Sequence, residues 1–242
     1  PSKLNPFRSF QISLLQVHYA LNMLNNILDV NKIKTGSFKT NNAPFDLEDL
    51  MRRATTMQAV KAQGRGVMMS FDPPQGPCIA YTDEDIVSRI VTNFISNAVK
   101  FTSSGAIQPF ILPASSIERK FDDVSSIDIE GESVKVRMVA VGVADTGPGL
   151  TQELLNLAEA GLFNSDSQGM NSGAKNSGFG LHLAHQLAGT LGTRIHLSDL
   201  SYTQGLFNAD IAKAVKEQKS GTVLFVVVPV FEDGNHGKEK VL

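Results

Sequence analysis

Residues 83–102 constrain the fold strongly, because a helix over this segment has one polar and one apolar face. At about 100° per residue, four polar side chains fall within an arc of roughly 80°. They are Arg89, Asn93, Asn97 and Lys100. The apolar side chains fall on a separate arc that would face a core: Val87, Ile90, Val91, Phe94, Ala98 and Phe101. The segment is expected to carry a binding site on one face and a hydrophobic core on the other.

Two residues of the polar face, Asn93 and Asn97, indicate a function for it, because Asn has a low helix propensity. An amide oxygen can bind a hard cation such as Mg²⁺. The ammonium group of Lys100, one turn further on, can bind phosphate oxygens. The alternative is a solvated helix face on which the Asn residues have no binding role, and this segment alone leaves both interpretations open.

Apolar spacing predicts two helices before this segment. Residues 9–34 carry apolar side chains at intervals of three and four, which is typical of coiled coils and helix bundles. Gly36 is expected to end this helix, and residues 41–44 to form a hinge. A second helix is expected from Asp46, with an apolar face made of Leu47, Leu50, Met51, Ala54, Met57 and Val60.

Runs of β-branched and apolar residues predict the strands. They are expected over residues 67–71, 78–81, 134–143, 194–197 and 221–230, with the last strand central. Further helices are expected over residues 151–158, 178–191 and 208–219. Residues 103–132 are expected to form a long loop, and residues 233–242 a disordered tail.

Charge and cysteine content exclude several classes of protein. With 22 basic and 24 acidic residues the net charge is −2, which argues against a broad nucleic-acid surface. The only cysteine, Cys78, allows no internal disulfide and no cysteine-based zinc cluster, and a buried strand position is favoured over a catalytic thiol. No apolar run approaches the roughly 20 residues of a membrane span. We expect a cytoplasmic fragment, and leave open a membrane anchor elsewhere in a longer protein.

Three motifs occur in order: NFISNAVKF at 93–101, DTGPG at 145–149 and SGFGL at 177–181. Each alone is common. Together they resemble the Bergerat ATP-binding fold, and specifically the sensor histidine kinases of two-component phosphorelays. Residues 24–36 (LNNILDVNKIKTG) resemble the end of the second helix of that family's dimerisation domain, and residues 45–47 (FDL) resemble the start of its catalytic domain.

The resemblance implies an α+β fold, a two-layer α/β sandwich with a mixed sheet of about five strands packed on three helices. A long bundle-type helix would precede it. Residues 1–42 would be the partial second helix of the dimerisation and phosphotransfer domain with its linker. Residues 43–242 would be the catalytic ATP-binding domain, with insertions near 103–132 and 198–220 and with residues 161–177 as the ATP lid.

For the phosphate end of the nucleotide, the resemblance implies that Asn97 binds Mg²⁺ between the phosphates of ATP. Asn93 would support this end, and Lys100 would neutralise phosphate charge. Gly178 and Gly180 would direct backbone amides of a helix start towards the phosphates. Asn97 and Lys100 are thus the expected catalytic residues, and Asn97 the expected metal ligand.

For the base, the resemblance implies that Asp145 accepts a hydrogen bond from the adenine amino group, helped by Thr222. Phe101 would pack beside the base, and Gly147 and Gly149 would let the backbone approach it. The remaining motif positions expected to contact ATP are Leu150, Ser177, Phe179 and Leu181.

The implied activity is transfer of the γ-phosphoryl group of ATP to a histidine on the dimerisation helix of the same or a partner chain. The phosphate would then pass to an aspartate of a response-regulator receiver domain, and the full-length protein would be a homodimer. No Ser-His-Glu-x-x-Thr-Pro motif is present, so the acceptor is expected before Pro1. His18 has no acidic neighbour and is disfavoured as a substitute.

Two alternatives remain. A degenerate kinase would bind ATP as a signalling scaffold without transfer, which Asn176-Ser177 favours slightly because a Gly-Thr pair is common there. Another ATPase of the same fold would usually carry a water-activating Glu early in the central helix, where Arg89 stands one turn before Asn93. That residue argues against efficient ATP hydrolysis.

Overall fold

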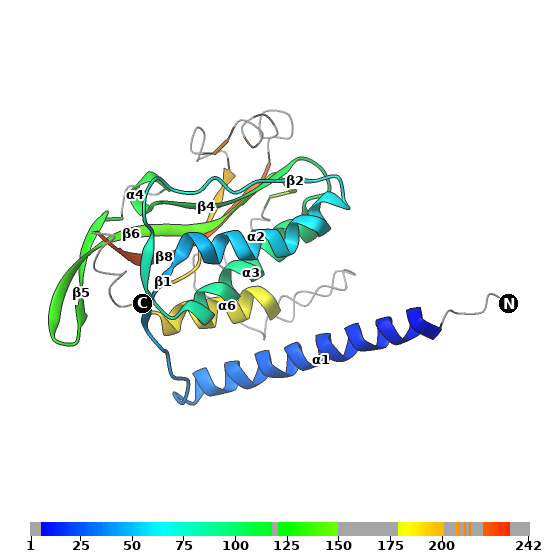
Figure 1. The fold of residues 1–242 in the computed structure, drawn as a ribbon, viewed down its shortest axis with the longest axis horizontal. Helices are drawn as coiled ribbons and strands as arrows, with labels where there is room; N and C mark the ends of the chain where they lie inside the picture. Colours follow the sequence, from blue (N-terminus) through cyan, green and yellow to red (C-terminus); the bar gives the residue numbers. More distant parts are fainter. Residues whose placement is uncertain are drawn as a thin grey trace. The chain divides into compact units, whose positions relative to one another are not determined.

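The computed structural model describes residues 6–117, 121–149, 179–200, 207–208, 211, 213 and 220–232. The chain divides into two compact units, residues 1–39 and 40–242 (Figure 1). The first unit is one long helix, α1 (Pro6–Lys34). Gly36 follows it with a φ of +68°, which confirms the expected stop. Large apolar side chains are exposed along α1: Phe10, Val17, Leu21, Leu24, Ile27 and Leu28.

The second unit is built on one mixed sheet, in which the described residues form eight strands. The path runs β1-β3-β8-β6-β4-β2, with β5 paired to β6 and β7 paired to β8. β2 pairs parallel with β4, and the other strand pairs are antiparallel. The strands are β1 (Ala43–Asp46), β2 (Met68–Met69), β3 (Ile79–Thr82), β4 (Ala106–Pro113), β5 (Val124–Ile129), β6 (Glu132–Asp145), β7 (His196–Asp199) and β8 (Thr222–Phe231).

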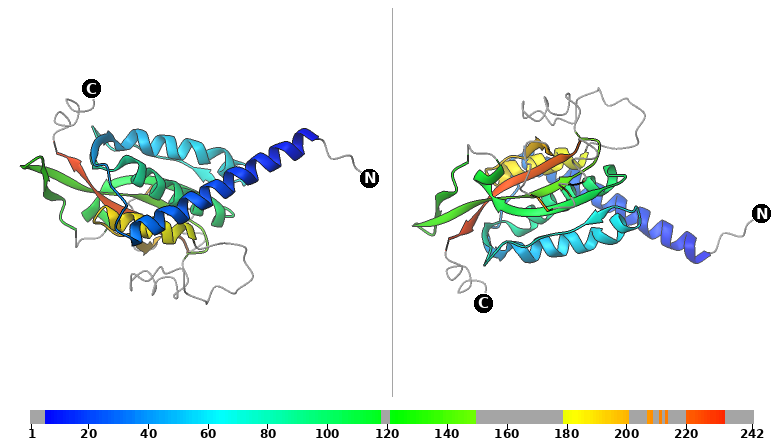
Figure 2. Two further views of the ribbon diagram at one scale, coloured as in Figure 1. Left: turned by 90° about the horizontal axis from the view of Figure 1, so that it is seen from below. Right: turned by 90° about the horizontal axis from the view of Figure 1, so that it is seen from above.

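Three helices lie on one side of this sheet (Figure 2). They are α2 (Leu47–Gln63), α3 (Glu84–Phe101) and α6 (Phe179–Thr190). α3 packs between the other two and against β6. Its apolar arc is buried as expected except at Phe101, which was wrongly placed on the core side and is 48% exposed. The carboxylate of Asp83 caps the first turn by accepting a hydrogen bond from the backbone N–H of Ile86.

The face of the sheet away from these helices is also apolar. Phe110 of β4, Ala140 of β6 and Phe225 of β8 belong to one buried cluster on it. The short helix α4 (Ala114–Ile117) packs there through Ala114. The region between β7 and β8 contributes Leu200, Phe207 and Ile211 to the same cluster.

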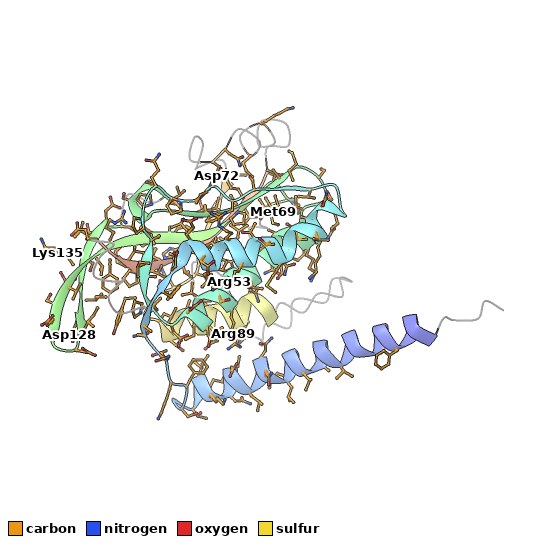
Figure 3. The ribbon with its side chains drawn as sticks, in the orientation of Figure 1. Arg53, Met69, Asp72, Arg89, Asp128 and Lys135 are labelled. Atoms are coloured by element: carbon orange, nitrogen blue, oxygen red, sulfur yellow. The ribbon has the colours of Figure 1, made fainter. Side chains whose placement is uncertain are left out.

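The expectation of a long loop over residues 103–132 was wrong, since β4, α4 and β5 lie there. β4 contains Pro109, which argued against a strand. β2 pairs only with Ala106 and Ile107, so no described strand pairs with the outer edge of β4 at the proline, and an edge tolerates proline. β5 is polar and is held by its hairpin with β6, on which Asp128 and Lys135 lie in Figure 3. The sheet therefore has eight strands where about five were expected.

Smaller corrections concern the segment before α3. The expected hinge at 41–44 overlaps β1, because Pro44 pairs with Tyr81 at a sheet edge. Met57 and Val60 were wrongly placed on the buried face of α2, since they are 70% and 75% exposed. The buried arc continues instead through Gln58 and Ala62.

Cys78 is buried just before β3, as expected. Burial raises the pKa of its thiol to about 11, so the thiol is protonated at neutral pH. No helix in the described part of the chain is long and apolar enough to cross a membrane.

Gly142 lies at the centre of the sheet, where an added methyl group would meet the Leu224 carbonyl and lie 2.6 Å from Phe225 Cβ. We expect Gly142→Ala to lower the free energy of unfolding by about 1–3 kcal/mol, measured by urea denaturation. Gly189→Ala is the matched control. Gly189 lies in α6 with open space around it, so this change should be neutral or stabilising by about 0.5–1 kcal/mol. Equal effects at the two glycines would contradict the packing argument.

Candidate nucleotide site

The polar face of α3 contains a hydrogen-bonded pair of amides. Asn97 Nδ2 donates to Asn93 Oδ1 over 3.0 Å, and both residues are half-buried. Asn93 also accepts, at its backbone carbonyl, a hydrogen bond from Ser96 Oγ. Because its nitrogen is held by Asn93, Asn97 can present its amide oxygen to a cation or another ligand.

The first turn of α6 lies directly on this pair. A methyl group at Gly180 would lie 2.7 Å from Asn93 Nδ2 and 2.9 Å from Oδ1. A larger residue at position 180 would displace the Asn93 amide from this position. The structure thus brings Gly180, of the third motif, against Asn93, of the first motif.

Asp145, the last residue of β6, is a buried carboxylate with 7% exposure. Its Oδ1 accepts hydrogen bonds from the Gly147 backbone N–H at 2.8 Å and from Thr102 Oγ1 at 3.4 Å. Among the described residues both hydrogen bonds end on Oδ1, which leaves Oδ2 to accept one from a ligand. Burial raises the pKa of Asp145 to about 6, although the hydrogen bonds from Gly147 and Thr102 lower it in part.

Hydrogen bonds between Thr146 and Ala106 fix the loop after Asp145. The Thr146 N–H donates to the Ala106 carbonyl at 3.1 Å, and its hydroxyl accepts from the Ala106 N–H at 2.9 Å. A methyl group at Gly147 would lie 2.7 Å from Asp145 Oδ1. Gly149 has a φ of +77°, a conformation that glycine adopts without strain.

The Asn93–Asn97 pair and the loop at Asp145 lie at opposite ends of the second half of α3. From Asn93 to Thr102, the residue that caps the end of α3, is about 13 Å along the helix axis. Thr222 pairs with Asp145 across β8 and β6 and is buried. Lys100 and Phe101 lie between the two ends and are exposed, with Lys100 Nζ 5.2 Å from the centre of the Phe101 ring.

Some of the expected site residues cannot be placed. Leu150, Ser177, Gly178, the lid at 161–177 and the helix at 151–158 lie outside the described residues. Phe179 and Leu181 lie in the first turn of α6, and Leu181 is half-buried. Sequence reasoning missed Thr102 and Thr146, which hold Asp145 and its loop. The available signals were that Thr102 directly follows Phe101 and that Thr146 lies within the DTGPG motif.

The described residues contain no group of three or more His, Cys, Asp or Glu side chains able to hold a metal ion. The polar face of α3 fits Mg²⁺ in another way, through one protein ligand and the phosphates of a nucleotide. It offers the single neutral oxygen of Asn97, and Mg²⁺ in nucleotide sites is commonly held by few protein ligands together with phosphate oxygens. These residues therefore fit a cation that arrives with a nucleotide.

Comparisons with known proteins identify the family of the chain. A family model for histidine kinase-, DNA gyrase B- and HSP90-like ATPases matches residues 82–232. The chain is 29% identical over 179 residues to the sensor protein GacS of Pseudomonas syringae pv. syringae, covering 72% of this chain and 18% of that protein. It is 27% identical over 173 residues to the aerobic respiration control sensor protein ArcB of Escherichia coli K12, covering 71% and 20%. The chain thus spans a fifth or less of these two relatives.

Solved structures show the same fold. The crystal structure of full-length ShkA in complex with AMPPNP has a TM-score of 0.58 at 20% identity, covering 96% of this chain and 40% of that chain. The Acinetobacter baumannii histidine kinase AdeS has a TM-score of 0.57 at 14% identity, covering 93% and 84%. At these identities the likeness establishes the fold alone.

The buried carboxylate predicts a pH dependence of stability. Its pKa is about 6 when folded, against an unfolded value of 3.8, so the folded state holds the proton more tightly. The stabilisation is complete below about pH 4 and is lost as pH rises through about 6. Relative to Asp145→Asn, the wild-type domain should lose about 1–3 kcal/mol of unfolding free energy between pH 4.5 and 7.5. Urea denaturation at several pH values measures this, and Asp122→Asn, at an exposed residue, is the control. Parallel profiles for wild type and Asp145→Asn would refute it.

Proposed function

The chain belongs to the family of histidine kinase-, DNA gyrase B- and HSP90-like ATPases, and within this family we propose that it is the catalytic ATP-binding domain of a sensor histidine kinase. It binds Mg-ATP and transfers the γ-phosphoryl group to a histidine on a dimerisation helix. The observation that carries the proposal is the pairing of a buried carboxylate, Asp145, with an amide and ammonium stripe on one helix.

The base is selected by Asp145. Its Oδ2, which accepts no hydrogen bond from the described residues, accepts one from the exocyclic amino group of adenine, while Oδ1 stays bound to Gly147 and Thr102. Guanine carries a carbonyl oxygen at the corresponding position, and two acceptors repel each other. Thr222, beside Asp145 in the sheet, supplies a hydroxyl at the same end. Phe101 lies at the end of α3 and covers the base.

The phosphates are held at the other end. Asn97 directs its oxygen to Mg²⁺, and Asn93 keeps that amide in one orientation. When bound, Mg²⁺ neutralises phosphate charge and stabilises the charge that develops during transfer. Lys100 contributes a further positive charge. Gly180 brings the start of α6 against Asn93, so that backbone amides there face the phosphates.

The site favours transfer to an amino-acid side chain over hydrolysis. Arg89 occupies the turn of α3 before Asn93, and a guanidinium group cannot act as the general base that activates water. The histidine is supplied by a dimerisation helix of the same or a partner chain. The exposed apolar stripe of α1 supports pairing of such helices in a homodimer. Relay to the aspartate of a response-regulator receiver domain completes the proposed function.

Calorimetry tests the ATP site. We expect Asp145→Ala to weaken ATP binding by about tenfold to a hundredfold, because a hydrogen bond to a charged group contributes about 1.5–3 kcal/mol. Asn97→Ala should bind ATP with the same affinity with and without Mg²⁺. The control is Asp122→Ala, at an exposed position, which should bind like wild type. Absence of binding by the folded wild-type domain at millimolar ATP would contradict the proposal.

Phosphotransfer separates a kinase from an ATP-binding scaffold. The longest natural protein that contains this chain is incubated with ATP labelled at the γ-phosphate. We expect an acid-labile, base-stable label on histidine, reduced at least about 100-fold in Asn97→Ala, because the phosphates lose their bound charge. ATP binding without any such label would instead favour the degenerate scaffold.

A further inference from the structure

We propose that Ser220 is a positioning residue of the nucleotide site, and that the end of the segment between β7 and β8 holds the adenine loop from behind. The adenine loop is defined as residues 145–149. This inference rests on the proposed function, because it concerns the affinity of the same site. The two ends of the expected insertion at 198–220, Leu200 and Ser220, thus support that site.

Ser220 acts on the loop through one hydrogen bond. Its Oγ donates to the Gly147 carbonyl at 3.0 Å, and Ser220 is half-buried. On the other side of the same residue, the Gly147 N–H donates to Asp145 Oδ1 at 2.8 Å. Gly147 is thus fixed at both its backbone groups. Because it has no side chain to restrain it, these two hydrogen bonds determine the conformation of the loop beside the carboxylate.

Gly221, the next residue, packs against the back of the loop. A methyl group there would meet the Asp145 carbonyl and would lie 2.6 Å from Leu200 Cδ2. Leu200 is buried, and its N–H donates to the Gly221 carbonyl at 3.3 Å. The chain therefore leaves β7 at Leu200 and returns to β8 at Gly221, both behind the adenine loop, and these two residues contact each other.

The same segment has a second anchor that does not touch the loop. The Asn208 N–H donates to Gln108 Oε1 at 2.9 Å, and Asn208 Nδ2 donates to Ser70 Oγ at 2.7 Å. Gln108 Nε2 in turn donates to Asp72 Oδ2 at 3.0 Å, and Asp72 is labelled in Figure 3. This polar cluster fastens the segment to β4. It allows the anchoring of the segment to be altered separately from the support of the loop.

Removal of the Ser220 hydroxyl leaves the Gly147 carbonyl without its donor. The loop then samples more conformations in the empty site, and the nucleotide must order it on binding. One neutral hydrogen bond corresponds to about a three- to tenfold change in affinity. Ser220 supports the base end only, so ATP, ADP and adenosine should lose affinity by the same factor.

The experiment compares Ser220→Ala, Ser220→Val and Ser220→Thr with wild type by calorimetry with ATP, ADP and adenosine. Val and Thr have the same shape and differ in the hydroxyl. We expect Ser220→Ala and Ser220→Val to bind all three ligands about three- to tenfold more weakly, with the Mg²⁺ dependence unchanged. Ser220→Thr should restore wild-type affinity.

Two control variants separate positioning from a general loss of structure. Asn208→Ala removes the second anchor, and Ser115→Ala removes a hydroxyl that donates to Asp123 at the far end of β4. Both should keep wild-type nucleotide affinity, whatever their melting temperatures. Equal binding by Ser220→Val and Ser220→Thr, or a loss confined to ATP, would overturn the inference while wild-type binding upholds the proposed function. Absence of adenine-nucleotide binding by wild type would overturn the proposed function and this inference with it.

Discussion

The antiparallel ladder between β6 and β8 is the interaction on which the rest of the domain depends. It runs from the Val136–Phe231 pair to the Asp145–Thr222 pair. Paired residues point to the same face of a sheet and successive residues alternate. This register places Asp145 and Thr222 together on the helix side and Phe225 on the other side, above Gly142. A slip by one residue would move the carboxylate to the wrong face.

The buried carboxylate opposes folding, and the loop around it offsets part of that cost. Desolvation raises the pKa of Asp145, while the Gly147 N–H and the Thr102 hydroxyl lower it. Both donors reach the same oxygen, so the second oxygen has no hydrogen-bond partner among the described residues. A ligand amino group would supply that partner. Binding and stability are therefore linked at this residue, because any ligand that binds only the folded state stabilises it.

The features predicted from the sequence are those in which one segment carries its own signal. The α3 segment has both its arcs and its cap within about 20 residues, and β8 is a continuous apolar run. The strand β4 was missed because Pro109 argues against a strand. The proline is tolerated because the neighbouring strand β2 is too short to reach it, which the sequence does not reveal. Met57 and Val60 were misplaced because helical spacing shows that a helix has an apolar face, but it does not show how much of that face the neighbouring elements cover. The structure leaves the roles assigned to the ATP-contacting residues as proposals.

The support of the nucleotide loop depends on contacts between residues far apart in the sequence, which no local pattern could predict. Ser220 and Gly147 are 73 positions apart, and Asn208 and Ser70 are 138 apart. β8 is apolar on both faces, so its sheet needs cover on both sides. α3 and α6 cover one side, and Leu200 and Ile211 help to cover the other. Because Leu200 also contacts Gly221 behind Asp145, the residues that close the second face are the ones that support the nucleotide loop. At Leu200 the cover of the sheet and the shape of the site are thus one packing arrangement, and a change of this side chain is expected to reach the adenine loop.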